Sequence, residues 1–219
     1  VKDGRIVQCV LDGLTASIAF NKNGELVTPK DTVFKSKNEL GDAYGMKKSS
    51  SIGKEWYEQA AAFASYVQGK TLEEVKAIKV DEQNYLTGAD IKSSVTISVG
   101  GFLEAIEKAV GSAQDAPEGL SESDLLRVGL VSDMSSSASA ADGKDGAGAL
   151  NVTVAAVARN TGGVITGCVI DSVSSSVTFS KSGAITSNLS MEVKSKNELG
   201  ESYGLKKSSS LGKEWNEQA

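Results

Sequence analysis

Histidine is absent from the 219 residues, and this absence excludes several kinds of active site. Histidine is the commonest general base in enzymes and the commonest metal-binding side chain. A Ser-His-Asp triad, a Cys-His dyad and a histidine-based zinc site are therefore excluded. The two cysteines, Cys9 and Cys168, are too few for a disulfide framework.

Other scarce features narrow the class of protein. Aromatic residues make up only 5% of a chain that is 40% hydrophobic, so its core must consist mainly of Val, Leu, Ile and Ala. The sequence has neither an apolar run of about 18 residues, which a membrane-spanning helix needs, nor a signal-peptide pattern. The net charge is −5 without a long basic run, which argues against nucleic-acid binding. Residues 1–7 resemble the middle of a hairpin, so we expect the natural chain to begin earlier.

The most prominent feature that is present is an internal repeat. Aligning Cys9 with Cys168 places residues 9–60 on residues 168–219 without a gap, with 28 identities in 52 positions. Most identities fall in one repeated block, KSKNELGDAYGMKKSSSIGKEWYEQA at residues 35–60 and KSKNELGESYGLKKSSSLGKEWNEQA at residues 194–219. Duplication of a whole domain explains this identity, which is therefore no sign that each shared residue has a function.

The two copies are cut at different places. We predict a first copy at residues 1–112 that lacks its N-terminal strands, a linker at 113–124, and a second copy at 125–219 that lacks its C-terminal helices. Half-units expose strand edges and apolar helix faces. One complete module would form from residues 125–219 and the helical region 60–110. Three alternatives remain open: circular permutation within the chain, self-association by exchange of complementary half-repeats, and a chain that is a fragment of a longer protein.

Alternating apolar residues predict strands in both copies. Turns are predicted at residues 21–24, 161–163 and 180–183, and residues 133–148 are predicted to form a flexible loop. The predicted strands are residues 5–12, 15–20, 25–28, 32–35, 125–132, 150–158, 164–171, 175–179 and 184–193.

Helices are predicted between these strand-rich parts. Trp56, Ala60, Phe63 and Val67 have helical spacing from Lys54 on, and Gly69 is expected to end that helix. Thr71 and Glu74 form a capping box for a short helix. A longer helix is predicted at residues 94–110, where Gly100 and Gly101 would each cost roughly 1 kcal/mol. The fold class is therefore α+β, a mainly antiparallel sheet packed with two or three helices.

The first candidate site precedes the predicted long helix. Small residues at a helix N-terminus allow backbone N–H groups to approach an anion. The alternative is that Asp90 or Ser93 is only an N-cap. The candidate residues are Thr87, Gly88, Ala89, Asp90 and Ser93.

The segment TGADIKSSV, together with Gly69-Lys70-Thr71 before it and the apolar helix after it, resembles the FMN-binding domain. This family occurs in the sodium-pumping quinone reductase and the Rnf electron-transfer complex, where a Thr in an SGAT or TGAT motif carries FMN through a phosphoester. The chain is especially similar to FMN-binding-like lipoproteins of anaerobic Gram-positive bacteria, some of them tandem. The resemblance covers residues 1–112 and, incompletely, 125–219.

The departure from the family lies at Asp90, which stands where the family has the flavin-bearing Thr. A carboxylate cannot form that linkage, and it repels the FMN phosphate at close range. The resemblance therefore implies an FMN-binding-like fold without covalent flavin, with noncovalent FMN as the alternative cofactor.

Other candidates have plainer interpretations. Residues 47–54 and 206–213 combine lysines and hydroxyls, but Glu55 follows the lysine where a Walker A loop needs Ser or Thr. We interpret them as solvated loops with Ser51 as a helix cap. Cys9 and Cys168 are expected to be buried, inert thiols, with an inter-repeat disulfide as the alternative. Trp56 and Trp215 are expected in the core. Glu39, Asp42 and Glu55 form no evident acid–base pair.

The expected function is a non-enzymatic binding or scaffold module of a cell-surface lipoprotein. Its extracellular location is implied by the resemblance alone, and a membrane contact would run only through a lipid anchor outside this chain. The first alternative is an extracytoplasmic electron-transfer protein that binds FMN noncovalently. A hydrolase is a third interpretation, which activity screening of Asp90→Asn and Glu55→Gln would test. We expect neither metal nor nucleic acid as a ligand.

Overall fold

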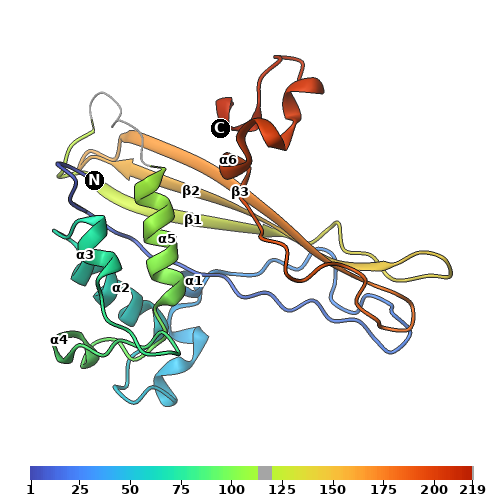
Figure 1. Ribbon diagram of the computed structural model, residues 1–219, viewed down its shortest axis with the longest axis horizontal. Coiled ribbons are helices and arrows are strands. Elements are labelled where there is room, and N and C mark those ends of the chain that lie inside the picture. The colour runs from blue at the N-terminus through green and yellow to red at the C-terminus, as the bar shows by residue number, and fades with distance from the viewer. Residues whose placement is uncertain (113–119, 219) are drawn as a thin grey trace. The chain divides into compact units, whose positions relative to one another are not determined.

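The computed structural model describes residues 1–112 and 120–218, and the predicted linker lies largely outside these residues. The described residues form a three-stranded antiparallel sheet in the order β1-β2-β3 together with several helices (Figure 1). The predicted α+β class is therefore confirmed.

The three strands come from the second half of the chain. They are β1 (Leu125–Asp133), β2 (Gly146–Arg159) and β3 (Ile165–Phe179). The predicted turn between β2 and β3 is present, since the N–H of Gly163 donates to the carbonyl of Asn160 at 3.0 Å. The two strands predicted at residues 164–171 and 175–179 are one continuous strand.

The strands predicted in residues 5–35 do not form, and this prediction was wrong. Only isolated bridges occur there, such as that between Phe20 and Leu26. The reason is that backbone N–H groups of this segment donate to side-chain hydroxyls and not to the carbonyls of a neighbouring strand. The N–H of Phe34 donates to Ser132 Oγ at 2.7 Å and that of Leu26 to Ser139 Oγ at 2.9 Å, so hydroxyls replace a strand ladder. Residues 184–193 likewise hold one bridge, from Ile185 to Phe179.

The helices form largely where local signals place them. Gly69, at φ +79°, follows the end of α2, and the capping box of Thr71 and Glu74 begins α3 as predicted. The α-helices are α1 (Lys37–Leu40), α2 (Trp56–Val67), α3 (Leu72–Lys76), α4 (Ala89–Lys92), α5 (Gly100–Gly111) and α6 (Lys196–Leu199). The 3-10 helices are η1 (Gly41–Tyr44), η2 (Met46–Lys48), η3 (Gly200–Tyr203), η4 (Leu205–Lys207) and η5 (Trp215–Glu217).

The long helix begins six residues later than predicted. The N–H of Thr96 donates to Gln59 Oε1 at 2.8 Å and that of Val99 to the carbonyl of Asn84 at 2.9 Å. Because tertiary partners take these donors, residues 94–99 stay outside the helix. Gly100 and Gly101 therefore stand at the start of α5 and do not weaken its interior.

The hydrophobic core is built by residues of the first copy. Phe63, Val67 and Val99 are completely buried, and Trp56 packs edge-on against Phe102 with ring centroids 5.5 Å apart. The expectation that Trp56 is a core residue is confirmed. The buried members of this cluster are Ile6, Leu11, Trp56, Ala60, Phe63, Ala64, Val67, Val75, Leu86, Ile91, Val95, Val99 and Ile106.

The chain divides into two compact units whose boundaries differ from those of the repeat. The first unit contains Val1–Gly13, Ser36–Val128 and Val157–Cys168, and the second contains Leu14–Lys35, Gly129–Ala156 and Val169–Ala219. The division of the sequence into two repeat copies stays a prediction.

Within each unit, segments remote in sequence are joined by hydrogen bonds. In the first unit, Gln8 Nε2 donates to the carbonyl of Asp124 at 2.6 Å, and Gln8 Oε1 accepts from the N–H of Leu126 at 3.2 Å. In the second unit, the N–H of Ala140 donates to the carbonyl of Gly24 at 2.8 Å. Residues 124, 126 and 140 are thus hydrogen-bonded to residues 8 and 24, which lie more than 100 positions earlier in the sequence.

Candidate functional site

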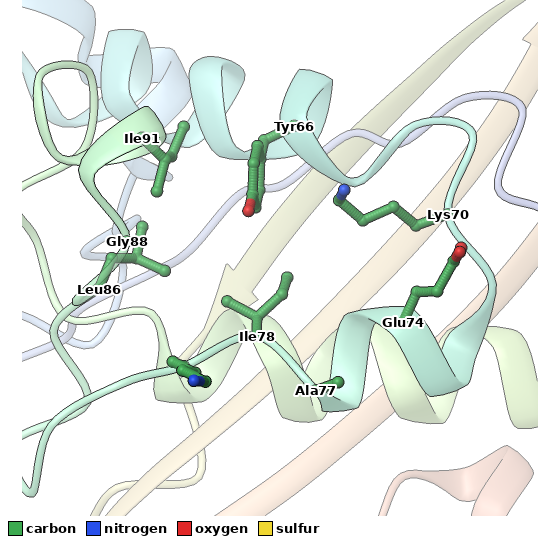
Figure 2. Close-up of a pocket in the computed structure, with 9 residues that line it drawn as sticks. Tyr66, Lys70, Glu74, Ala77, Ile78, Leu86, Gly88 and Ile91 are labelled. Carbon is green, nitrogen blue, oxygen red and sulfur yellow. The ribbon is translucent and has the colours of Figure 1, made fainter.

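One pocket of about 260 Å³ lies in the first unit, between the end of α2, helix α3 and the start of α4. We call it the Tyr66 pocket. Figure 2 shows Tyr66 and Lys70 on one side of it and Ala77 and Ile78 on the other. Its lining is Tyr66, Lys70, Glu74, Ala77, Ile78, Lys79, Leu86, Gly88 and Ile91.

Local sequence signals position these side chains. Gly69 turns the chain after α2 with its positive φ, which places Lys70 between α2 and α3. Leu86 and Ile91 are buried members of the core, so they give the pocket an apolar floor. Gly88 is the N-cap of α4 and presents backbone only. The pocket therefore joins an apolar floor to a polar rim.

The rim carries an excess of positive charge. Lys70 and Lys79 both line the pocket, and the Lys70 ammonium lies 4.5 Å from the centroid of the Tyr66 ring. The one carboxylate in the lining, Glu74, is paired with Arg5 at 3.1 Å. The backbone N–H of Thr71 and then this arginine hold the pKa of Glu74 below its usual value. The balance of charge favours an anionic ligand.

Asp90 interacts with the pocket through Tyr66. Burial, and after it the neighbouring Asp90 carboxylate, raise the pKa of Tyr66. Asp90 Oδ1 would lie 2.7 Å from a Cβ built on Gly88, so a side chain at this position would require the Asp90 carboxylate to move.

The five residues predicted from the TGAD segment separate into different roles. Gly88 lines the pocket and Asp90 helps to raise the pKa of Tyr66, whereas Thr87 Oγ1 donates to the carbonyl of Lys79 at 3.1 Å. Ala89 is the first residue of α4, and Ser93 is its C-cap. The segment does not open the long helix, since α4 spans four residues and Val99 is the N-cap of α5. Neither Asp90 nor Ser93 is an N-cap, which corrects that alternative.

Sequence reasoning missed most of the pocket. Tyr66, Glu74 and Ile78 were assigned no binding role, because their spacing indicated only helix packing. Lys70 was noted as part of Gly69-Lys70-Thr71, and that glycine was the available signal. Gly69 turns the chain between α2 and α3, and Lys70, the next residue, lines the pocket.

The lysine- and serine-rich loop at residues 47–54 is held in place by hydrogen bonds to Glu55. The carboxylate of Glu55, itself buried, accepts from the N–H groups of Met46 at 2.8 Å and Lys47 at 2.9 Å. Glu55, and not Ser51, is the N-cap of α2, which corrects the predicted cap. With its lone pairs used in this way, Glu55 has a structural role.

The two cysteines are both free thiols. Burial raises the pKa of Cys9 to about 11, which agrees with an inert thiol. Cys168 is exposed, so the expectation of burial was wrong for that residue. Its strand, β3, leaves its side uncovered, whereas Cys9 packs against the core.

A second, wider hollow of about 480 Å³ lies in the second unit and is lined by small polar side chains, among them Ser136, Asn151 and Ser175. Its one carboxylate, Asp133, accepts from the N–H and hydroxyl of Ser135 at 2.8 and 3.0 Å. These bonds lower the pKa of Asp133. Ala147, Ala149 and Leu150 also line this hollow, which has no lysine or arginine in its lining.

In residues 1–112 and 120–218, no group of three or more Cys, Asp or Glu side chains is arranged to hold a metal ion. No helix in those same residues has the length and apolar character needed to cross a membrane.

Comparison with known proteins gives one short similarity. Chlorophenol reductase of Desulfitobacterium hafniense is 51% identical over 43 residues, which are 20% of this chain and 13% of the reductase. The chain thus matches a small part of that relative's length. No family model matches the sequence, and no solved structure matches it.

Proposed function

We propose that this chain is a non-enzymatic binding module and that its Tyr66 pocket takes a small organic anion. One observation carries the proposal. Apolar Ile78, Leu86 and Ile91 line the same pocket as the cations Lys70 and Lys79. An apolar wall with a few convergent polar groups is typical of small-molecule sites. The resemblance to FMN-binding-like lipoproteins supports a place at the outer cell surface.

The size of the pocket decides which ligand is favoured. About 260 Å³ is below the range of roughly 300–1,000 Å³ typical of sites for drug-sized ligands. A single aromatic ring bearing a carboxylate or phenolate is therefore a better match than a whole FMN. The name of the partly similar reductase refers to a chlorophenol, a single-ring compound of this size.

Noncovalent FMN is the second candidate, favoured by Gly88 in the pocket wall at the segment that resembles the flavin motif. An absorbance scan of the purified protein tests it. A band near 450 nm on the order of one flavin per chain would support electron transfer. Colourless protein that gains no flavin on incubation with FMN would leave the small-anion proposal.

Titration with benzoate, followed by amide NMR shifts, tests the favoured ligand class. We expect shifts at Ile78, Gly88 and Ile91, and weaker binding in Lys70→Ala and Lys79→Ala. The matched control is Lys92→Ala, because Lys92 is an exposed lysine of α4 outside the lining. Shifts elsewhere with none at these three amides would contradict the proposal.

A further inference from the structure

Arg5 is held beside the turn between α2 and α3 by backbone hydrogen bonds. The N–H of Ile6 donates to the carbonyl of Lys70 at 2.9 Å, and the N–H of Gly69 donates to the carbonyl of Ile6 at 2.8 Å. Ile6 is buried in the core, which anchors this connection. Arg5 Nη1 donates to the carbonyl of Gly69 at 2.6 Å. The guanidinium is therefore placed next to the turn from which Lys70 enters the pocket lining.

Glu74, the carboxylate in the lining of the pocket, has two donors. Its Oε2 accepts from the N–H of Thr71 at 2.8 Å and from Arg5 Nη1 at 3.1 Å. The first bond belongs to the capping box of α3, which does not involve the arginine. The contribution of Arg5 is therefore mainly its charge, which neutralises that of Glu74.

Lys70 is a second cation close to Glu74. The N–H of Thr71, then Arg5, and last the charge of Lys70 lower the pKa of Glu74. The Lys70 ammonium nevertheless lies over the Tyr66 ring, 4.5 Å from its centroid. Figure 2 shows the ends of the Lys70 and Glu74 side chains pointing apart, with the ammonium directed toward Tyr66. Because Glu74 already has a cationic partner, Lys70 is available to an anion in the pocket.

We infer that Arg5 determines the charge specificity of the Tyr66 pocket, an inference that rests on the proposed function. By pairing with Glu74, Arg5 leaves Lys70 to bind the anionic group of the ligand. The pocket should then prefer an aromatic carboxylate over its uncharged isostere. Benzoate and benzamide are the simplest such pair, because both place the same ring on the apolar floor and differ in charge.

The loss of Arg5 would change the charge at the rim of the pocket. The unpaired Glu74 carboxylate would attract Lys70 and repel the anionic ligand. The side chains of Arg5 and Glu74 are 55% and 52% exposed, so solvent weakens both effects. We therefore expect a moderate loss, with benzoate binding about three- to tenfold weaker at low ionic strength.

Calorimetric titration of the full chain with benzoate and with benzamide, at pH 7 and low ionic strength, tests the inference. In Arg5→Gln, the preference for benzoate should fall by this factor while the affinity for benzamide stays the same. Adding Glu74→Gln to Arg5→Gln removes both charges and should restore the preference. The matched control is Lys2→Gln, because Lys2 is an exposed cation of the same segment whose partner, Glu122, is outside the lining.

The outcomes distinguish this inference from the proposed function. Benzoate that does not bind the natural chain would contradict the proposed function, and the inference with it. An unchanged preference in Arg5→Gln, or one that the added Glu74→Gln does not restore, would contradict the inference alone.

A measurement without ligand tests the pairing of Arg5 with Glu74 itself. NMR titration of the Glu74 carboxyl group should give a higher pKa in Arg5→Gln than in the natural chain, because a favourable positive charge is lost. An unchanged pKa would overturn the inference whether or not benzoate binds.

Discussion

The pKa of Tyr66 is raised by burial and then by the neighbouring carboxylate of Asp90. Tyr66 gives the pocket a hydroxyl and one face of a ring beside Lys70. Sequence reasoning singled out Asp90 but could not find its partner, because Tyr66 lies 24 positions earlier on another helix.

Replacing Asp90 by Asn should lower the pKa of Tyr66 toward its ordinary value, because the substitution removes the negative charge that opposes the phenolate. The fall should be partial, since burial is the larger cause and stays. Absorbance titration at alkaline pH, with Tyr66→Phe as the reference for the other tyrosines, measures it. An unchanged or higher Tyr66 pKa in Asp90→Asn would be inconsistent with the contact.

Glu74 provides a second residue-scale prediction, on pH dependence. Its pKa is lowered in the folded state, so its charge contributes stability that is present above the unfolded pKa of about 4.5 and is lost as the pH falls. Glu74→Gln retains an acceptor for the capping box. The urea midpoint of Glu74→Gln should therefore lie below that of the natural chain at pH 7, and the difference should shrink and vanish as the pH falls through the lowered folded-state pKa of Glu74. A difference that grows on acidification would contradict the assigned cause.

The elements show which features can be predicted from sequence. The turns at residues 21–24 and 161–163 and the start of α3 were predicted correctly, because their hydrogen bonds join residues within about four positions. The start of α5 and the conformation of residues 5–35 were not predicted correctly. The hydrogen bonds that determine them join Thr96 to Gln59 and Phe34 to Ser132, which are remote in sequence, so no local pattern reveals them.

Replacing the equivalent residues Trp56 and Trp215 tests whether the two copies differ in the burial of this ring. Trp56→Ala should cost about 3–5 kcal/mol, as for buried aromatic residues, because Trp56 lies against Phe102 in the core. Trp215→Ala removes a half-buried ring and should cost about 1–2 kcal/mol. Urea unfolding of both variants checks the ranking, and equal losses would show that the rings have equal surroundings.

Equivalent turn glycines test the contact of residues 21–24 with the segment after β1. Gly24 and Gly183 both have positive φ, so alanine strains either turn. A Cβ on Gly24 would also lie 2.9 Å from the Cβ of Ala140, whereas the space around Gly183 is open. Gly24→Ala should therefore cost about 1–3 kcal/mol more than Gly183→Ala. Thermal unfolding compares the two, and a larger loss for Gly183→Ala would contradict the packing at Gly24.

At the scale of the molecule, duplication has produced two nearly identical blocks in unequal surroundings. The repeat itself could be predicted from sequence, since identity needs no structure. The set of residues that form the core could not, because Ile170 and Trp215, the counterparts of Leu11 and Trp56, stay outside the main hydrophobic cluster. The apolar residues of a segment can be read from the sequence, but whether they are buried depends on contacts that only the structure shows.

Hydrogen exchange read by mass spectrometry tests this inequality most directly, because the two blocks have nearly the same sequence and therefore nearly the same intrinsic exchange rates. The amides of residues 56–60 begin a twelve-residue helix against the core, whereas residues 215–217 form a single 3-10 turn. We predict slow exchange at residues 56–60 and exchange at least a hundredfold faster at residues 215–218. Equal protection of the two stretches would contradict the difference in burial between Trp56 and Trp215.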